Sequence, residues 1–564
     1  MNHAEPQLVI DDLRRLTGPS LLWDEPGSII DVLVTGVPIE HVVESWQQQV
    51  RQLLDAVGWQ SEASCVRVFD GGASLAISSP IDALYASCDV NEIAWQRSCL
   101  QIAGEELPDF ESSVAELKKT IGEERNPNLI ALQKFATEYG AAFLWDDDEV
   151  SIGHGKTVQI WPTPEAPAVE EVNWSAARHI PCALITGTNG KSTSVRVASK
   201  IAEVAGVTAG VTSTDFIRVG DHIIDEGDYS GPGGARVLLR DERTELALLE
   251  VARGGILRRG LPIESAAAAL ITNLAEDHLG DYGINTLAEL TAVKFVVAKA
   301  LGPDGILVLN ADDDSIVEYS NKIDNTLCWF SLSSANHVMQ QHMQQGGRVV
   351  FERDGRLIYH HNGVEEEIIT VAQIPMTMNG AAKHNVANAL GVVGLCKALQ
   401  FSPAAIAKGL SAFHSSAKDN PGRGNQFEYR GAKVFVDFAH NEHSMNAIVD
   451  TLKSIPAKRR LLMLGHAGDR SDLEMQTLAA AAHKLGVDHW VVAELPNYLR
   501  GRESGEIPRI IAGQLQELGV AEQEIEYADS VFEGAKKALA WAQEGDSLLL
   551  LAPDDRDKIF AMLA

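Results

Sequence analysis

A glycine-rich stretch with a lysine and two hydroxyl side chains is the clearest candidate for chemistry in this sequence. It reads Ala183-Leu-Ile-Thr-Gly-Thr-Asn-Gly-Lys-Ser-Thr193. The pattern predicts a buried strand that ends at Thr186, a loop containing Gly187 and Gly190, and a helix that begins near Lys191. In such a loop, backbone N–H groups and the positive end of a helix can surround a nucleotide phosphate.

The side chains that follow the glycines fit the same chemistry. Lys191 would reach the terminal phosphates, and the hydroxyl of Ser192 or Thr193 would hold Mg²⁺. A glycine-rich turn can also serve packing alone. A lysine at a helix start, however, opposes the helix dipole unless a bound anion offsets it. The spacing from Gly187 to Gly190 is shorter than in the common G-x-x-x-x-G-K-[ST] loop.

Three more groups are candidate metal or phosphate ligands. Glu250 ends an apolar stretch, and a buried carboxylate is costly without a cation, which favours a Mg²⁺ ligand. Asp277 and His278 follow a second apolar stretch, Ala267–Asn273. Asp277 could instead cap a helix, and His278 could be an ordinary core or surface histidine. A phosphate loop in the same sheet favours the metal and phosphate role.

Lys294, Arg423 and Asp437 each allow two interpretations. Lys294 lies among apolar residues of a predicted helix, where a lysine usually extends its amine to solvent. Arg423 lies between glycines at a candidate hinge, and it is either a surface charge or a phosphate clamp. Asp437 ends an apolar stretch, so it either holds a nucleotide or substrate group or belongs to an ordinary turn.

The elements that would position these residues predict an α/β fold of three domains. Residues 1–165 mix helical and strand patterns, which predicts an α+β domain. Residues 175–422 alternate strand and helix, which predicts a P-loop domain with a parallel sheet and ligands beyond the carboxyl ends of its strands. After the Asn420–Gly424 turn the alternation restarts, so residues 423–564 are expected to form a Rossmann-like domain.

Two segments before the phosphate loop carry weaker signals. Gly153–Lys156 resembles the end of a phosphate loop, but no helical pattern follows it, so we interpret it as a hairpin turn. The prolines of Trp161–Glu171 favour an extended spacer at a domain boundary.

Composition excludes several classes of protein. The formal net charge of −31 over 564 residues, without a basic stripe, argues against a nucleic-acid partner. The six cysteines are scattered and predict reduced thiols rather than a zinc site. We find no secretory signal and no apolar run of the roughly 18 residues that span a bilayer, so we expect a soluble, cytoplasmic protein without a membrane partner.

Together these residues resemble the Mur ligase superfamily of ATP-dependent amide-forming ligases. The resemblance covers about residues 178–560. It rests on six motifs in the family's order: Thr186–Thr193, Thr272–His278, Lys294, His384–Asn388, Asn420–Arg423 and Asp437–His440. It implies a ligase that binds ATP and Mg²⁺, activates a carboxylate as an acyl phosphate, and transfers the acyl group to an amine.

The resemblance also implies roles for individual residues. Those expected to bind ATP are Thr188, Asn189, Gly190, Lys191, Ser192, Thr193, Asn385, Arg423 and Asp437, with Asn385 near the adenine. Those expected to face the metal are Ser192, Glu250, His278 and Lys294, and the catalytic set is Lys191, His278 and Lys294. Many family members carbamylate the lysine that Lys294 matches, and the sequence leaves that modification open here.

Within the superfamily the sequence most resembles the Mur-like half of the cyanophycin synthetases. Gly227–Pro232, Leu249–Leu257, Gly468–Arg470 and, in the N-terminal domain, Leu16–Ser20 carry this likeness. Those enzymes place an ATP-grasp module before the Mur-like half, where this sequence has only the proline-rich spacer. The implied substrates are an amino acid and an aspartate-containing peptide or polymer.

Other functions and the state of assembly remain open at this stage. A P-loop kinase or ATPase would need only the first motif, and a nucleotide-gated binding or scaffold protein would need no catalysis. The sequence leaves open whether the protein forms a homo-oligomer.

Overall fold

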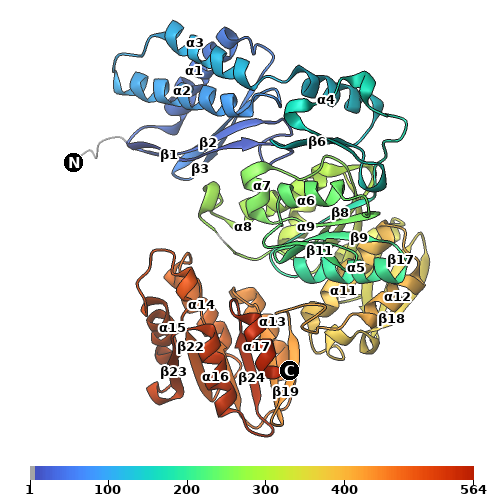
Figure 1. Ribbon diagram of the computed structural model, residues 1–564. Helices are drawn as coiled ribbons and strands as arrows, with labels where there is room; N and C mark the ends of the chain where they lie inside the picture. Colours follow the sequence, from blue (N-terminus) through green and yellow to red (C-terminus); the bar gives the residue numbers. More distant parts are fainter. Residues whose placement is uncertain (1–6, 278) are drawn as a thin grey trace. The chain divides into compact units, whose positions relative to one another are not determined.

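A four-stranded antiparallel sheet, here called the N-terminal sheet, begins the chain in the computed structural model, which describes residues 7–277 and 279–564 (Figure 1). Its order is β1-β2-β4-β3, with bounds Gln7–Leu16, Gly27–Thr35, Gly72–Ser78 and Ser64–Phe69. Alternate residues such as Ile30, Val32 and Leu75 form a core with the helices on one face. These helices are α1 (Ile39–Val57), α2 (Leu84–Ala103) and α3 (Phe110–Glu124).

A smaller sheet follows helix α4 (Pro127–Tyr139) and consists of β5 (Phe143–Trp145), β6 (Glu149–Ile152) and β7 (Gln159–Pro162). Gly153–Lys156 joins the antiparallel strands β6 and β7, so the prediction of a hairpin turn is confirmed. The prediction of an extended spacer after it is wrong. Short 3₁₀ turns occupy Thr163–Glu165 and Val169–Glu171, and Ala166 and Trp174 pack into a core with α4.

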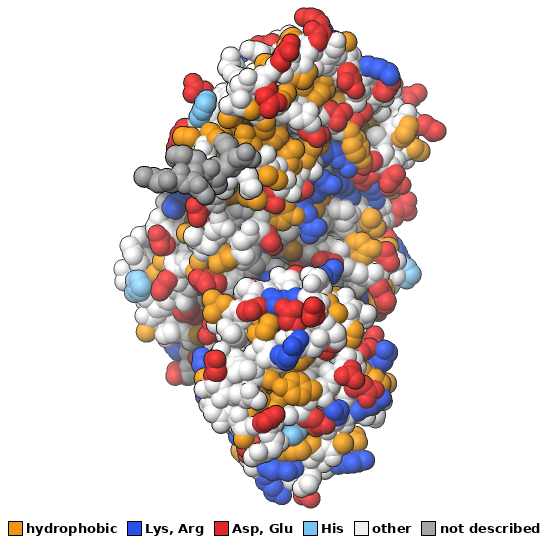
Figure 2. Space-filling view, turned by 90° about the vertical axis from the view of Figure 1, so that its left-hand side faces the viewer, with side chains coloured by type: hydrophobic (Ala, Val, Ile, Leu, Met, Phe, Trp, Pro, Cys, Tyr) orange, Lys and Arg blue, Asp and Glu red, His pale blue; other side chains and the backbone are white. Residues whose placement is uncertain are grey.

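By their contacts the described residues fall into two units. The first contains residues up to Val195, Ala205–Cys328 and Ala398–Gln400, and the second contains Arg196–Val204, Trp329–Lys397 and Phe401–Ala564. Among the residues that the structure describes, no helix combines the length and the apolar character needed to span a membrane. On the face shown in Figure 2, acidic and basic side chains are interspersed with hydrophobic ones.

The first unit contains the predicted phosphate-loop sheet. Its strands lie in the order β11-β10-β9-β12-β8-β13-β14. Their bounds are His222–Glu226, Phe216–Val219, Ala209–Thr212, Leu246–Glu250, Cys182–Thr186, Ala266–Ile271 and Leu301–Asn310. Five neighbouring strands, β9, β12, β8, β13 and β14, are parallel, as predicted. Strands β10 and β11 add an antiparallel edge that the alternation of strands and helices did not indicate. All five residues of β8 are buried, which explains its continuous apolar sequence.

Helices follow the strands of this sheet. They are α5 (Lys191–Val204), α6 (Pro232–Arg240), α7 (Arg253–Arg259), α8 (Leu287–Phe295) and α9 (Asp314–Ser320). Helix α5 begins where β8 and its loop end, and α7 begins three residues after β12 ends. The loops between strand and helix therefore lie at the carboxyl ends of the parallel strands, where ligands bind in such sheets.

The second unit includes an antiparallel meander and two helices. The meander is formed by β16 (Arg348–Arg353), β17 (Arg356–His361) and β18 (Val364–Thr370), and it follows β15 (Thr326–Ser331) and α10 (His337–Gln344). The helices are α11 (Lys383–Ala398) and α12 (Pro403–Ala412). Helix α11 carries Asn385.

The C-terminal sheet has the order β19-β20-β24-β21-β22-β23, parallel except for β19. The bounds are Asn425–Tyr429, Ala432–Asp437, Ser547–Leu551, Arg460–Leu464, His489–Ala493 and Ile525–Ala528. Leu462 and Leu549 pack toward α13 (Glu442–Lys453), α14 (Asp472–His483) and α15 (Glu506–Glu517). Leu461 and Leu548 pack toward α16 (Val531–Trp541) and α17 (Arg556–Leu563). Successive strand residues face opposite helical layers, which gives the predicted Rossmann-like architecture.

Candidate active site

The phosphate loop has the backbone that its glycines require. Gly187 has φ +137°, and a Cβ at this position would lie 2.0 Å from Oγ1 of Thr272. Gly190 has φ +86°. Only glycine fits at position 187 without displacing the neighbouring strand end, so the tight loop that the sequence predicted here packs closely against the end of β13.

The end of strand β13 holds this loop in place. The backbone N–H of Thr188 donates to the carbonyl of Asn273 at 2.8 Å, and that of Asn189 donates to Oδ1 of Asn273 at 3.1 Å. The carbonyl of Asn189 accepts two hydrogen bonds, one from Nδ2 of Asn273 at 3.0 Å and one from Oγ1 of Thr272 at 2.6 Å. Two motifs that are 83 to 85 residues apart in sequence are therefore hydrogen-bonded into one cradle.

Lys191 turns its amine back over the loop. Nζ donates to the carbonyls of Gly187 at 3.1 Å and Thr188 at 2.8 Å. The ammonium group is thus held over the glycine-rich loop, where it would neutralise the charge of a bound phosphate.

A buried carboxylate lies beside the first turn of α5. Glu250 is 2% exposed at the end of β12, and Ser192 Oγ donates to its Oε1 at 3.2 Å. Thr193 is buried next to Ser192. No group of three His, Cys, Asp or Glu side chains within the described ranges forms a metal cluster. Mg²⁺ often takes only one or two carboxylates and completes its shell with phosphates and water, so a Ser192 and Glu250 pair fits this ion.

Lys294 is buried, which excludes the interpretation of a lysine that extends to solvent. It is 4% exposed on α8. Burial lowers the pKa of its amine well below the ordinary value of 10.5, and the nearby charges of Lys191 and Arg253 lower it further, against the opposing effect of Asp277 and Glu250. This environment therefore favours the neutral form of the amine more than solvent does.

Arg253 lies close enough to Lys294 to affect its charge, and the sequence analysis assigned it no role. It is 9% exposed at the start of α7, and its Nη2 lies 2.6 Å from Oδ2 of Asp281. Its position three residues after Glu250, in the sequence Glu-Val-Ala-Arg-Gly-Gly, is the signal that could have identified it. Asp277 does not cap a helix, because the next helical turn begins at Asp281 and α8 at Leu287. His278 lies outside the described residues.

In the second unit, Arg423 and Asp437 lie together. Asp437 accepts hydrogen bonds from the backbone N–H groups of Gly424 at 2.6 Å and Ala439 at 2.8 Å. Burial raises the pKa of Asp437, and the charge of Arg423 opposes that shift. The Arg423 guanidinium lies 4.3 Å from the centre of the Phe438 ring. The Asp437 carboxylate therefore orders the Gly424 turn that carries Arg423.

Asn385 is buried on α11. Its Nδ2 donates to the carbonyl of Met376 at 3.0 Å, and its Oδ1 accepts a bond from Asn388 at 3.3 Å. These contacts fix the orientation of its amide.

Taken unit by unit, the structure groups most of the predicted residues. The first unit brings Thr188, Asn189, Gly190, Lys191, Ser192, Thr193 and Glu250 to one edge of the sheet, with Lys294 in electrostatic contact with Lys191 and Glu250. The second unit pairs Arg423 with Asp437 and holds Asn385 on a separate helix.

Two family models match this chain over the parts just described. The Mur ligase middle domain matches residues 185–396, and the Mur ligase glutamate ligase domain matches residues 422–553. The chain belongs to the Mur ligase family. Both matched regions contain the site residues of their respective parts, the phosphate loop in the first and Asp437 in the second.

Among curated proteins, this Mur ligase family member is similar to cyanophycin synthetases. It is 36% identical to that of Nostoc sp. over 332 residues, which are 59% of this chain and 37% of the Nostoc protein. It is 34% identical to that of Synechocystis sp. over 385 residues, which are 68% of this chain and 43% of the relative. The chain thus spans about two fifths of the length of these relatives. A solved structure of E. coli FolC in complex with DHPP and ADP matches with a TM-score of 0.49 and 19% identity, over 65% of this chain and 84% of that chain.

Proposed function

We propose that this chain is an ATP-dependent ligase that joins a carboxylate to an amine. The observation that carries the proposal is the phosphate loop with the Ser192 and Glu250 pair at its end, in a chain that matches two domains of the Mur ligases. A phosphate cradle alone would equally suit a kinase. The match to the second family domain, with Arg423 and Asp437 within it, favours the ligase.

The proposed reaction has two steps. A carboxylate oxygen of the acceptor attacks the γ-phosphorus of ATP, the bond to the bridging oxygen breaks, and ADP leaves. The amine nitrogen then attacks the acyl carbon, phosphate leaves with the bonding electrons, and the nitrogen loses a proton. Bound ATP supplies the phosphoryl group, and Mg²⁺ neutralises charge on it.

The chain itself supplies position and charge. The N–H groups at the start of α5 would orient the phosphates, and Lys191 would offset the charge that develops on the transferred group. Ser192 and Glu250 would hold the metal together with His278. Arg423 and Asp437 would bind the nucleotide from the second unit, and Asn385 would lie near the adenine.

Lys294 is proposed to be carbamylated. Burial and the neighbouring cations shift its amine toward the neutral form, which is the form that adds to carbon dioxide, giving a carbamate and releasing a proton. The resulting anion would lie among the cations Lys191 and Arg253, which stabilise it, and would add a metal ligand.

The proposed substrates are an amino acid, as the amine, and an aspartate-containing peptide or a cyanophycin-like polymer, as the acceptor. The similarity to cyanophycin synthetases over about three fifths of this chain supports this choice. We also place the reaction in the cytoplasm, where ATP and amino acids are available.

A release assay tests the proposal. The purified protein, ATP and Mg²⁺ are combined with single amino acids and candidate acceptor peptides, and ADP and the coupled product are measured. We expect ADP release only when an acceptor carboxylate and an amine are both present, with a matching product by mass spectrometry. ADP release without an amine, or a phosphorylated product, would indicate a kinase or ATPase. Binding of nucleotide without turnover under any combination would indicate a scaffold.

A further inference from the structure

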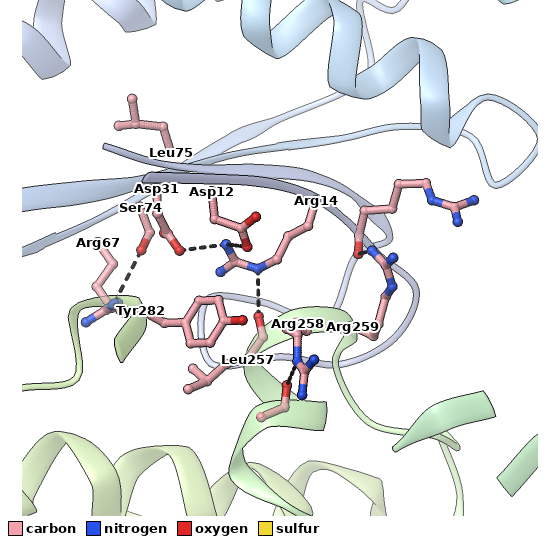
Figure 3. A network of polar contacts seen from close by, with 12 residues as sticks. Asp12, Arg14, Asp31, Arg67, Ser74, Leu75, Leu257, Arg258, Arg259 and Tyr282 are labelled. Atoms are coloured by element: carbon pink, nitrogen blue, oxygen red, sulfur yellow. Dashed lines mark hydrogen bonds and ion pairs between the residues drawn. The ribbon is translucent and has the colours of Figure 1, made fainter. Parts of the chain in front are cut away.

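Arginines of the N-terminal sheet hold the segment that follows the Thr272–His278 motif (Figure 3). Arg67 lies on β3, and its guanidinium points to the Tyr282 turn. Nη2 donates to the carbonyl of Tyr282 at 2.6 Å and Nη1 to that of Gly283 at 3.0 Å. The same group lies 4.0 Å from Oε1 of Glu289. One side chain of the N-terminal sheet thus contacts three positions of the 281–289 segment.

Arg14 supports the same turn from β1. Its Nη1 lies 2.6 Å from Oδ2 of Asp31, which is fully buried, and its Nε donates to the carbonyl of Leu257 at 3.0 Å. The guanidinium is stacked over the ring of Tyr282, 4.8 Å from its centre. Because Asp31 and Leu257 fix its orientation, Arg14 presents a rigid surface to Tyr282.

The turn needs such external support. Tyr282 has φ +56° and Gly283 has φ +62°. A left-handed backbone is unfavourable for tyrosine, because its Cβ then lies too close to the following carbonyl oxygen. A Cβ on Gly283 would lie 2.4 Å from the Phe69 ring, so the turn is fitted closely to the N-terminal sheet. Backbone in this conformation persists only where its surroundings impose it.

The held segment leads directly to the candidate site. Asp281 pairs with the buried Arg253, whose charge acts on Lys294. Glu289 also closes the N-terminus of α8, since its Oε2 accepts from the backbone N–H of Thr286 at 3.0 Å and that of Asn285 at 2.8 Å. Helix α8 carries Lys294. Every contact of Arg67 with this segment therefore bears on the position of Lys294 or its charged neighbours.

We propose that Arg67 is a positioning residue: from the N-terminal sheet it fixes the 281–289 segment, and through it Arg253 and Lys294, in the arrangement used for catalysis. Arg14 assists by stacking on Tyr282. The expected effect on kcat rests on the proposed function. The expected effect of Arg67 on the order of the 281–289 segment does not. The N-terminal sheet then completes the active site and is more than an attached module.

The test compares Arg67→Ala and Arg67→Lys with two controls in the full chain. Arg51 is a matched control, because it also donates to backbone carbonyls, including that of Glu62 at 2.9 Å, and to a carboxylate, Asp55 at 2.6 Å, all within the N-terminal part. Arg240 is the second control. It joins α6 to Asp146 at 2.6 Å and Glu149 at 3.1 Å, away from the 281–289 segment.

Hydrogen exchange followed by mass spectrometry gives the structural result. In Arg67→Ala we expect amides of residues 279–295 to exchange about tenfold faster or more, because three contacts that restrain local opening are lost. Arg67→Lys should recover part of the protection, since an ammonium can still reach one carbonyl. Arg51→Ala and Arg240→Ala should leave exchange in 279–295 as in the unaltered protein. If Arg67→Ala does not fold, the comparison is made with Arg67→Lys, which should show a smaller increase in exchange over the same residues.

Kinetics give the functional result. For Arg67→Ala we expect kcat to fall about tenfold, with KM for ATP changed less than about twofold, because bound nucleotide is retained while Lys294 is misplaced. The proposal would be overturned if hydrogen exchange and kcat were unchanged in both Arg67 variants. It would also be overturned if Arg240→Ala changed exchange and kcat as much as Arg67→Ala, because any contact made by the N-terminal part of the chain would then have the same effect. If the unaltered protein shows no ligase activity, the proposed function fails, and the exchange data still decide the positioning role.

Discussion

The hydroxyl of Ser192 donates a hydrogen bond of 3.2 Å to Oε1 of Glu250, joining the first turn of α5 to the end of β12. Glu250 is almost completely buried, and a carboxylate in such a place is stabilised by a cation. The pair is therefore the structural centre of the proposed Mg²⁺ site, and it allows a direct substitution test.

Glu250→Gln keeps the size of the side chain and removes its charge. We expect the Mg²⁺ concentration for half-maximal ADP release to rise about tenfold or more, because an anionic ligand is lost. The control is Glu245→Gln. Glu245 is exposed and lies just before the same strand, so this variant should have the Mg²⁺ dependence of the unaltered protein. An unchanged Mg²⁺ dependence in Glu250→Gln would remove Glu250 from the metal site.

Gly187→Ala tests the fit of the phosphate loop. The added methyl would meet Thr272 Oγ1, whereas at Gly58, which also has a positive φ, a Cβ would find nothing within 4 Å. We expect Gly58→Ala to lower the free energy of unfolding by about 1 kcal/mol and Gly187→Ala by about 3–5 kcal/mol, since steric overlap adds to backbone strain. Urea denaturation measures both. Equal losses would mean that the loop is not closely packed against β13.

Carbamylation of Lys294 predicts a spectroscopic signal. After incubation with ¹³C-labelled bicarbonate, the full chain should show a carbamate carbon resonance by NMR, and Lys294→Ala should lack it. Lys299→Ala is the control, because Lys299 donates at 2.8 Å to Asp24 and is only partly buried. A signal that persists in Lys294→Ala would assign the modification to another lysine.

His154 predicts a dependence of stability on pH. Burial, together with a smaller effect of the charge of His179, lowers the pKa of this histidine from 6.5 to about 3. Below about pH 6.5 the unfolded chain takes up a proton that the folded chain does not, so the free energy of unfolding falls as the pH decreases toward 3. In His154→Phe the free energy of unfolding should fall less between pH 7 and pH 4, because the uptake of one proton by the unfolded chain is removed. Urea denaturation at a series of pH values measures this. The exposed His222→Asn should not, and a pH slope unchanged by His154→Phe would contradict the assignment.

The sequence predicted those parts of the fold and site that depend on local pattern. The continuous apolar residues of β8, the glycines after them and the helix start at Lys191 are adjacent in the chain, and so the cradle was predictable. Glu250 was found because it ends an apolar strand. The Asp437 position followed from the same reasoning.

The missed features depend on contacts between distant residues. The helical pattern around Lys294 could not tell a buried amine from an exposed one, because burial is decided by the elements that pack on α8. The bonds from Arg67 to Tyr282 and Gly283 span more than 200 residues and leave no local signal. The proline-rich segment was wrongly predicted to be a spacer. Its proline content indicates extended backbone, but it carries no information about the apolar core on which Trp174 packs.

Transfer of isotope from the acceptor carboxylate tests the central claim most directly. The carboxylate of a productive acceptor is labelled with ¹⁸O, the reaction is run with ATP, Mg²⁺ and the amine, and the released phosphate is examined by mass spectrometry. The proposed acyl phosphate predicts one ¹⁸O atom in each phosphate released, because the carboxylate oxygen that attacks phosphorus leaves with it. Phosphate without ¹⁸O, formed at the same rate as ADP, would show that water rather than the carboxylate receives the phosphoryl group.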